Sequence, residues 1–125
     1  MLAIIPKANA DLLFLTVHAG VEPAARKMNV GITWSGPDRE IDYGRQIRIV
    51  DVMIARRVDG LAISATDDQA LIGPVQRVSQ AGIPVTIFDS ALGIENYVSL
   101  VATDNYGGGC TAARLLATVV PQIPI

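Results

Sequence analysis

The feature that most constrains this chain is a set of four short apolar runs, each closed by small polar residues or by proline. The runs cover residues 2–6, 31–34, 60–64 and 84–89. Segments with the three- and four-residue apolar spacing of helices separate them. Apolar strands that alternate with helices predict a parallel sheet with helices on both faces. Ligands of such sheets bind outside the carboxyl ends of the strands, so the residues that close each run are the first candidates for function.

The alternation continues with a fifth strand at about 97–102 and a last helix at about 106–118. Right-handed crossovers restrict how such units can join. We therefore predict an α/β fold, a doubly wound parallel five-stranded sheet with strand order 2-1-3-4-5. The length of 125 residues suits one domain.

The first helix carries an apolar stripe that we expect to be buried. Its members recur at intervals of three and four residues: Leu13, Val17, Val21, Ala24 and Met28. Phe14 falls off this stripe, which favours a place beside the carboxyl ends of the strands. Asn9 or Asp11 can cap the helix, and Pro23 predicts a bend within it.

The composition excludes several classes of protein. The net charge is −2, so nothing attracts phosphates and nucleic acid is not an expected partner. Hydrophobic residues make up 50% of the chain, yet no run reaches the ~18 apolar residues that a membrane span needs. One Cys and one His exclude an internal disulfide and argue against a zinc site. The apolar excess predicts buried strands and a surface that should be covered.

Several short motifs occur together in one order. They are Ile4-Ile5-Pro6-Lys7, His18-Ala19-Gly20, Gln46, Arg57-Val58-Asp59-Gly60, Ala81-Gly82-Ile83-Pro84-Val85, Phe88-Asp89-Ser90 and Ala102-Thr103-Asp104-Asn105-Tyr106. As an ordered set they resemble the periplasmic sugar-binding proteins of ABC importers, of the ribose-binding type. The resemblance runs from residue 2 to about 117. It implies a fold of two similar α/β lobes that clamp a sugar between them, of which this chain matches the first.

The resemblance implies a boundary where family members cross to their second lobe. Residues 1–104 match the amino-terminal sugar-binding lobe, a periplasmic binding protein-like I lobe. Residues 105–125 match the first helix of a second lobe, followed by an apolar stub. The resemblance also implies a periplasmic location, although no signal peptide is recognisable in this chain.

The resemblance further implies which residues meet the sugar. Hydroxyls need planar polar groups, and the C–H face of the ring needs a flat apolar surface. Asp89 matches the sugar-binding acid after the fourth strand, and Phe14 matches a stacking aromatic after the first. Five more positions match polar residues of the same loops and of the crossing segment: Asp11, Ser64, Ser90, Thr103 and Asp104. Instead of contacting the sugar, the three acids and Thr103 can cap a helix or a turn, and Phe14 can be an ordinary core residue.

Four other features favour structural roles. Trp34 is expected to pack under the neighbouring helix rather than on a sugar, and His18 to lie on the helix surface or at a contact between lobes. Residues 107–109 are three glycines without the Lys-Ser/Thr of a phosphate loop, so helix entry or a close contact is favoured. Cys110 has no base nearby in the sequence, which argues against a catalytic thiol.

We therefore predict binding of a monosaccharide or polyol for ABC-type import, with no catalysis, cofactor or metal. The expected partners are the sugar and, for the complete protein, the membrane subunits of an ABC permease. The last helix exposes apolar residues, which predicts self-association of the chain. Two alternatives remain. One is the effector domain of a LacI-type transcription regulator, which needs a helix-turn-helix before the first strand. The other is an enzyme on a Rossmann-like sheet, which no nucleophile–base pair, metal cluster or glycine-rich loop after the first strand supports.

Overall fold

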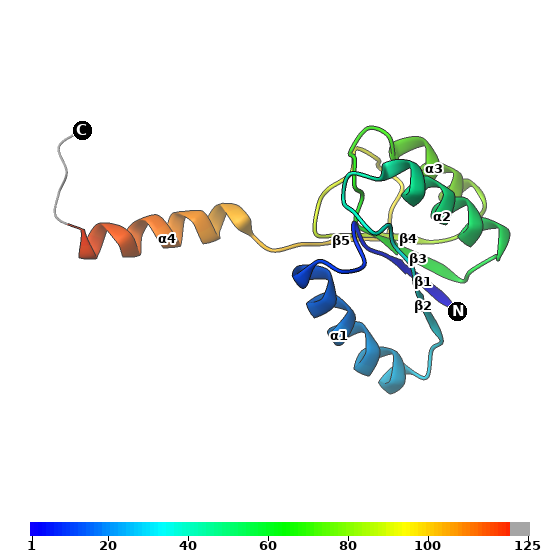
Figure 1. Cartoon of the computed structure of the whole chain (residues 1–125), viewed down its shortest axis with the longest axis horizontal. Helices are drawn as coiled ribbons and strands as arrows, with labels where there is room; N and C mark the ends of the chain where they lie inside the picture. Colours follow the sequence, from blue (N-terminus) through cyan, green and yellow to red (C-terminus); the bar gives the residue numbers. More distant parts are fainter. Residues whose placement is uncertain (121–125) are drawn as a thin grey trace.

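The computed structural model describes residues 1–120. Strands and helices alternate along the chain from β1 to β4, and β5 and α4 follow (Figure 1). The elements are β1 (Leu2–Ile5), α1 (Leu12–Met28), β2 (Ile32–Trp34), α2 (Tyr43–Ala55), β3 (Gly60–Ile63), α3 (Ile72–Gln80), β4 (Val85–Phe88), β5 (Ser99–Val101) and α4 (Asn105–Val119). Each expected strand and helix is present, with ends that differ from the expected ones by a few residues.

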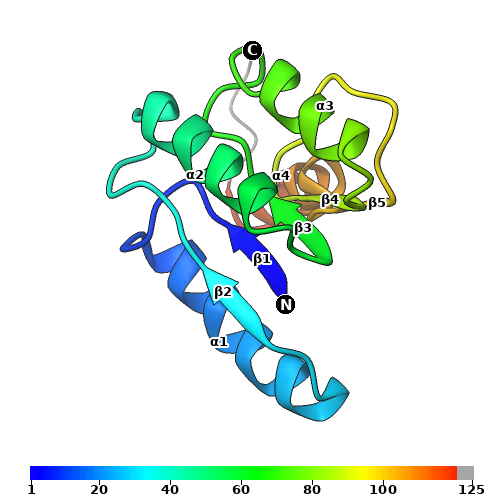
Figure 2. The same cartoon turned by 90° about the vertical axis from the view of Figure 1, so that its right-hand side faces the viewer.

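All five strands belong to one parallel sheet in the order β2-β1-β3-β4-β5, which confirms the predicted topology. The helices lie in two layers, with α2 and α3 on one face and α1 on the other (Figure 2). Parallel pairing brings the carboxyl ends of β1, β3 and β4 to one edge. That edge is where a ligand is expected to bind.

The face under α2 and α3 holds the hydrophobic core. Inward side chains of three neighbouring strands pack there on apolar residues of the two helices, all of them buried: Ala3, Ile5, Leu61, Ile63, Val85, Ile87, Ile49, Val50, Met53, Val75 and Val78. Gly82 ends the helical stretch after α3 with a φ of 79°, a left-handed conformation that glycine adopts without strain. The short link that follows returns the chain to β4.

The opposite face is only partly covered, and here one prediction was wrong. The stripe expected to be buried in α1 is largely exposed, with Leu13 52% and Met28 72% accessible, and Phe14 is the buried residue of the helix. The helix lies beside β1 and β2 (Figure 2), and its His18 ring stacks on Trp34 of β2 with centroids 4.4 Å apart. The stripe therefore faces a part of the sheet that no other element of residues 1–120 covers.

The last helix leaves the lobe altogether. Three residues, 102–104, separate α4 from β5, and α4 extends away from the sheet (Figure 1). None of its residues is buried. The Asp104 side chain caps it by accepting a hydrogen bond from the Gly107 amide at 2.9 Å. Of the expected apolar stub, residues 121–125 lie outside the described part of the chain.

Among the described residues, no helix has the length and hydropathy that a membrane span requires.

Candidate functional site

Asp89 stands at the carboxyl end of β4 in an unusual backbone conformation. Its φ is 66°, in the left-handed region that few residues other than glycine adopt, although Asp and Asn tolerate it. The Asp89 amide donates to the Val101 carbonyl at 2.9 Å, and the Ser90 amide donates to the Phe88 carbonyl at 2.8 Å. These two bonds hold the turn that directs the carboxylate to the edge of the sheet. Left-handed backbone of this kind often marks functional positions.

Three side chains from separate segments converge on that carboxylate. The Ser64 hydroxyl, directly after β3, donates to Oδ2 at 3.0 Å, and the Ser90 hydroxyl donates to the same oxygen at 3.1 Å. The Lys7 ammonium, two residues after β1, lies 3.0 Å from Oδ2 and donates to Ser90 at 2.6 Å. We call Lys7, Ser64, Asp89 and Ser90 the rim cluster.

The bonds of the rim cluster all use one carboxylate oxygen. Within residues 1–120 no hydrogen bond is made to Oδ1 of Asp89, while Oδ2 receives three donors. The side chain is 30% exposed, so Oδ1 can accept hydrogen bonds from a molecule in solution. Lys7 is 20% exposed and offers a donor next to it. The cluster can therefore meet a group that both donates and accepts, such as a hydroxyl.

The charge of Asp89 is stabilised in place. Burial of the carboxyl raises its pKa, but the Lys7 hydrogen bond, the Ser64 hydrogen bond, the Lys7 charge and the Ser90 hydrogen bond outweigh burial. The pKa of Asp89 is therefore below its ordinary value. Asp89 is an anion at neutral pH and acts as a hydrogen-bond acceptor only.

Replacing Lys7 with Met should raise the pKa of Asp89. The substitution removes one hydrogen bond and the neighbouring positive charge, whereas the burial that disfavours the anion remains. A carboxyl ¹³C NMR titration would measure the shift, with Lys27→Met at the exposed end of α1 as the control. In the native chain, the stability that Asp89 contributes is present above its unfolded pKa and is lost as pH falls through the lower folded pKa. Lys7→Met should shrink that contribution, and an unchanged titration would contradict the ion pair.

Gln46 of α2 ties the strand ends behind the rim cluster together. The side chain is completely buried. Its amide Nε2 donates to the Pro6 carbonyl at 3.0 Å and to the Ser64 carbonyl at 2.8 Å. Its Oε1 accepts from the Thr66 amide at 2.9 Å and from the Thr66 hydroxyl at 3.0 Å. One side chain therefore fixes the ends of β1 and β3, from which Lys7 and Ser64 project.

The remaining predicted site residues are placed differently. Asp11 is exposed and caps α1 by accepting from the Leu13 amide at 2.9 Å. Phe14 is buried, and its ring meets Phe88 edge to face with centroids 6.4 Å apart. Thr103 and Asp104 are exposed in the link to α4. The structure thus brings Ser64, Asp89 and Ser90 together, and Phe14 packs on the residue that precedes Asp89.

Two members of this arrangement were not predicted as site residues. Lys7 and Gln46 belonged only to the motifs that carried the resemblance. A lysine directly after the first strand was a usable signal, because it stands at the same edge as Asp89. Nothing local marked Gln46, since its partners lie 18 to 40 residues away in the chain.

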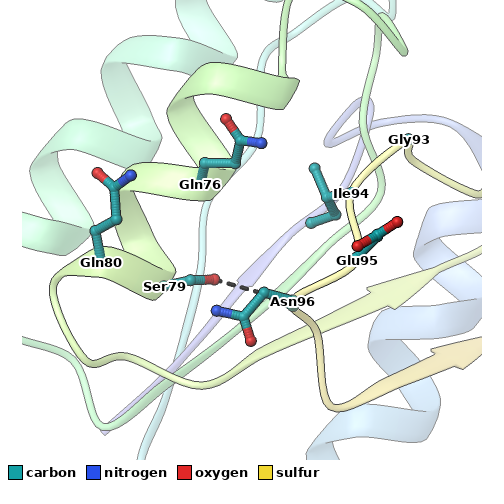
Figure 3. Close-up of a pocket in the computed structure, with 7 residues that line it drawn as sticks. All are labelled: Gln76, Ser79, Gln80, Gly93, Ile94, Glu95 and Asn96. Atoms are coloured by element: carbon teal, nitrogen blue, oxygen red, sulfur yellow. Dashed lines mark hydrogen bonds between the residues drawn. The ribbon is translucent and has the colours of Figure 1, made fainter.

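A separate hollow of about 540 Å³ lies between α3 and the connection from β4 to β5, lined by Gln76, Ser79, Gln80, Gly93, Ile94, Glu95 and Asn96. The Ser79 hydroxyl closes one side by donating to the Asn96 carbonyl at 3.1 Å. Figure 3 shows that the polar ends of these side chains spread in different directions rather than meeting at one point. The hollow lacks the convergent polar groups of the rim cluster. In residues 1–120, no three His, Cys, Asp or Glu side chains gather as metal ligands either.

Comparison with known proteins places this geometry in a family. The model of the periplasmic binding protein domain matches residues 2–123. The ribose import binding protein RbsB of Bacillus subtilis is 31% identical over 104 residues, which is 83% of this chain and 33% of that protein. The D-ribose/D-allose-binding protein of Pseudomonas aeruginosa is 33% identical over 91 residues, 71% of this chain and 28% of that protein. The chain thus spans about a third or less of the length of these relatives.

A solved structure with a similar fold is also that of a transport binding protein. The ABC transporter solute binding protein of Agrobacterium vitis with bound D-fucose has a TM-score of 0.87 and 30% identity, and the match covers 97% of this chain and 43% of that one. These relatives are transport binding proteins, so they lend no support to the regulator alternative. The family match over nearly the whole chain, together with the strand order and the acid after β4, shows that this chain belongs to the periplasmic binding protein domain family.

Proposed function

We propose that this chain is the amino-terminal lobe of a solute-binding protein and that its rim cluster binds a monosaccharide or polyol. The observation that carries the proposal is the Asp89 carboxylate, which is anchored through Oδ2 by Lys7, Ser64 and Ser90, is 30% exposed, and has no hydrogen bond to Oδ1 within residues 1–120. A fixed acceptor beside a fixed donor suits neighbouring hydroxyls of a sugar. The ribose, allose and fucose in the names of the relatives support this ligand class.

Phe14, Asp11, Thr103 and Asp104 belong to the proposed ligand site in different ways. Phe14 supports Phe88 beneath the cluster and offers an aromatic face only if α1 shifts, because its ring is completely buried. Asp11 stands at the start of α1, where its carboxylate is exposed. Thr103 and Asp104 stand in the link that leads to α4, and we propose that α4 begins the second lobe, which closes over the sugar.

The proposed activity is capture and delivery rather than catalysis. In the complete protein, closure of two lobes on the sugar would create the form that docks on the membrane subunits of an ABC permease, in the periplasm. One lobe supplies only part of the contacts. We therefore expect this chain alone to bind weakly, with a Kd on the order of 1 mM, or about −4 kcal/mol.

An NMR titration of the ¹⁵N-labelled chain with D-ribose, D-allose and D-fucose tests the proposal. At least one sugar should shift the amides of Ser64, Asp89 and Ser90 in a saturable way. Gln76 and Asn96 line the separate hollow, so the chemical shifts of the amides near them should not change and serve as the internal control. Saturable shifts confined to that hollow, or no shifts at the rim cluster up to high sugar concentration, would contradict the assignment.

A further inference from the structure

The loop after β1 connects the rim cluster to the start of α1. Lys7 stands two residues beyond β1 and reaches Asp89, and Asp11 caps α1 four residues later. The strand itself ends at Ile5, whose carbonyl accepts from the Ser64 amide at 3.0 Å. Lys7 therefore projects from a segment that the sheet does not hold. A lysine side chain has many rotamers, so its ammonium keeps one contact only where the backbone that carries it is held.

Asn9 holds this loop through the turn that follows β2. Its side-chain Nδ2 donates to the Gly36 carbonyl at 2.6 Å, and its Oδ1 accepts from the Gly36 amide at 2.9 Å. Its own backbone amide donates to the Pro37 carbonyl at 2.9 Å. A side-chain amide carries the donor and the acceptor of a peptide group. Asn9 therefore continues the pairing of β1 with β2 beyond the ends of both strands. We call Asn9, Gly36 and Pro37 the loop clamp.

The loop clamp fits closely against the residue that precedes Lys7. A Cβ atom on Gly36 would lie 2.7 Å from Cγ of Pro6 and 3.0 Å from the Pro6 carbonyl oxygen, so the approach requires glycine. Pro6, Gly36 and Pro37 are all buried. The Pro6 carbonyl also accepts from Nε2 of Gln46 at 3.0 Å. The residue in front of Lys7 is thus held by contacts with both the loop clamp and α2.

We infer that Asn9 is a positioning residue for the proposed sugar site, because it holds the loop so that Lys7 reaches Asp89. Within residues 1–120, the hydrogen bonds of Asn9 go to the turn after β2 and none goes to the rim cluster. Its effect therefore passes through the Lys7 ammonium, which lies 3.0 Å from Oδ2 of Asp89 and 2.6 Å from Oγ of Ser90. The effect on sugar affinity rests on the proposed function, whereas the effect on the contact between Lys7 and Asp89 does not.

A carboxyl ¹³C NMR titration without sugar tests the action on Lys7. Asn9→Ala should raise the pKa of Asp89, because it releases Lys7 from the position in which its hydrogen bond and its charge lower that pKa. Asn96→Ala removes an exposed asparagine side chain beside the separate hollow and should leave the pKa of Asp89 unchanged. In a Lys7→Met background, Asn9→Ala should raise the pKa of Asp89 no further, and a full additional rise there would overturn the inference. If Asn9→Ala lowers the Tm but leaves the pKa of Asp89 at its native value, Asn9 only stabilises the fold and the inference is wrong.

Gly36→Ala tests the loop clamp while it leaves the Asn9 side chain in place. The added Cβ has to displace Pro6, so the pKa of Asp89 should rise as it does in Asn9→Ala. Gly73→Ala adds the same methyl group in α3, where it meets nothing within 4 Å, and is the control. A native pKa of Asp89 in a folded Gly36→Ala chain would contradict the role of the loop clamp.

The sugar titration then measures the effect on binding. D-ribose, D-allose and D-fucose are the probes, and Asn9→Ala should raise the Kd of each one that binds the native chain. The expected rise is about threefold to tenfold, the range for one neutral hydrogen bond, and Asn96→Ala should bind like the native chain. An unchanged Kd in Asn9→Ala beside a raised pKa of Asp89 would refute the role in binding. If none of the three sugars binds the native chain, the proposed function fails, and the titration without sugar still decides whether Asn9 positions Lys7.

Discussion

Replacing Gln46 with Leu should destabilise the lobe by about 2–4 kcal/mol, which is roughly 10 °C in Tm for a domain of this size. Leucine has a similar volume but leaves the Pro6 and Ser64 carbonyls and the Thr66 amide without their buried partner. An unsatisfied buried polar group costs far more than an average hydrogen bond contributes. The ends of β1 and β3 should loosen together.

Urea unfolding followed by circular dichroism would measure this loss. The matched control is Gln80→Leu, the same substitution at an exposed position at the end of α3, which should change stability by less than about 0.5 kcal/mol. Equal midpoints for the two variants would mean that the bonds of Gln46 are not needed to hold the strand ends. A rim cluster disturbed by Gln46→Leu should also show altered amide shifts at Ser64.

Replacing Asp89 with Ala should weaken sugar binding by about 1.5–3 kcal/mol, the range for a hydrogen bond to a charged group. This corresponds to a roughly 10- to 150-fold higher Kd. Two effects combine, because the acceptor is lost and Lys7 and Ser90 lose the partner that positions them. The NMR titration used for the native chain can follow the weaker binding, since sugars dissolve to high concentration.

Two variants make the result interpretable. Asn tolerates the left-handed backbone that Asp89 adopts. A loss of binding in Asp89→Asn would therefore be due to the missing charge rather than to a changed backbone. Asp59→Ala removes the same charge just before β3, at the opposite edge of the sheet, and should bind sugar like the native chain. Unchanged affinity in Asp89→Ala, with the fold intact, would refute its role in the site.

The strand order was predictable because each strand is a short apolar run and the crossovers allow few topologies. The burial of α1 was not predictable in the same way. Its stripe has helical spacing but faces a part of the sheet that no other element of residues 1–120 covers, so Leu13 and Met28 remain exposed. Periodicity identifies the apolar face of a helix, but burial depends on whether another element reaches that face.

Some contacts of the candidate site could likewise be predicted from the sequence, and others could not. The meeting of Ser64, Asp89 and Ser90 follows from parallel pairing, which brings the ends of β3 and β4 to one edge. The contact between Lys7 and Asp89 could not be predicted, because it depends on the path of the loop after β1. The position of Phe14 under Phe88 likewise depends on how far α1 lies across the sheet, which the residues alone do not determine.

Because the core lies on one face of the sheet, different parts of the lobe should unfold locally at different free energies. β3 is buried between neighbouring strands and under α2 and α3, whereas α1 is anchored by one fully buried ring. The free energy of local unfolding therefore decreases from the centre of the sheet towards α1. Undocking of α1 alone would uncover Phe14 while the rim cluster keeps its geometry, because Gln46 belongs to the other layer. We therefore expect the aromatic surface and the polar anchors of the proposed site to lie on parts of the lobe that unfold independently.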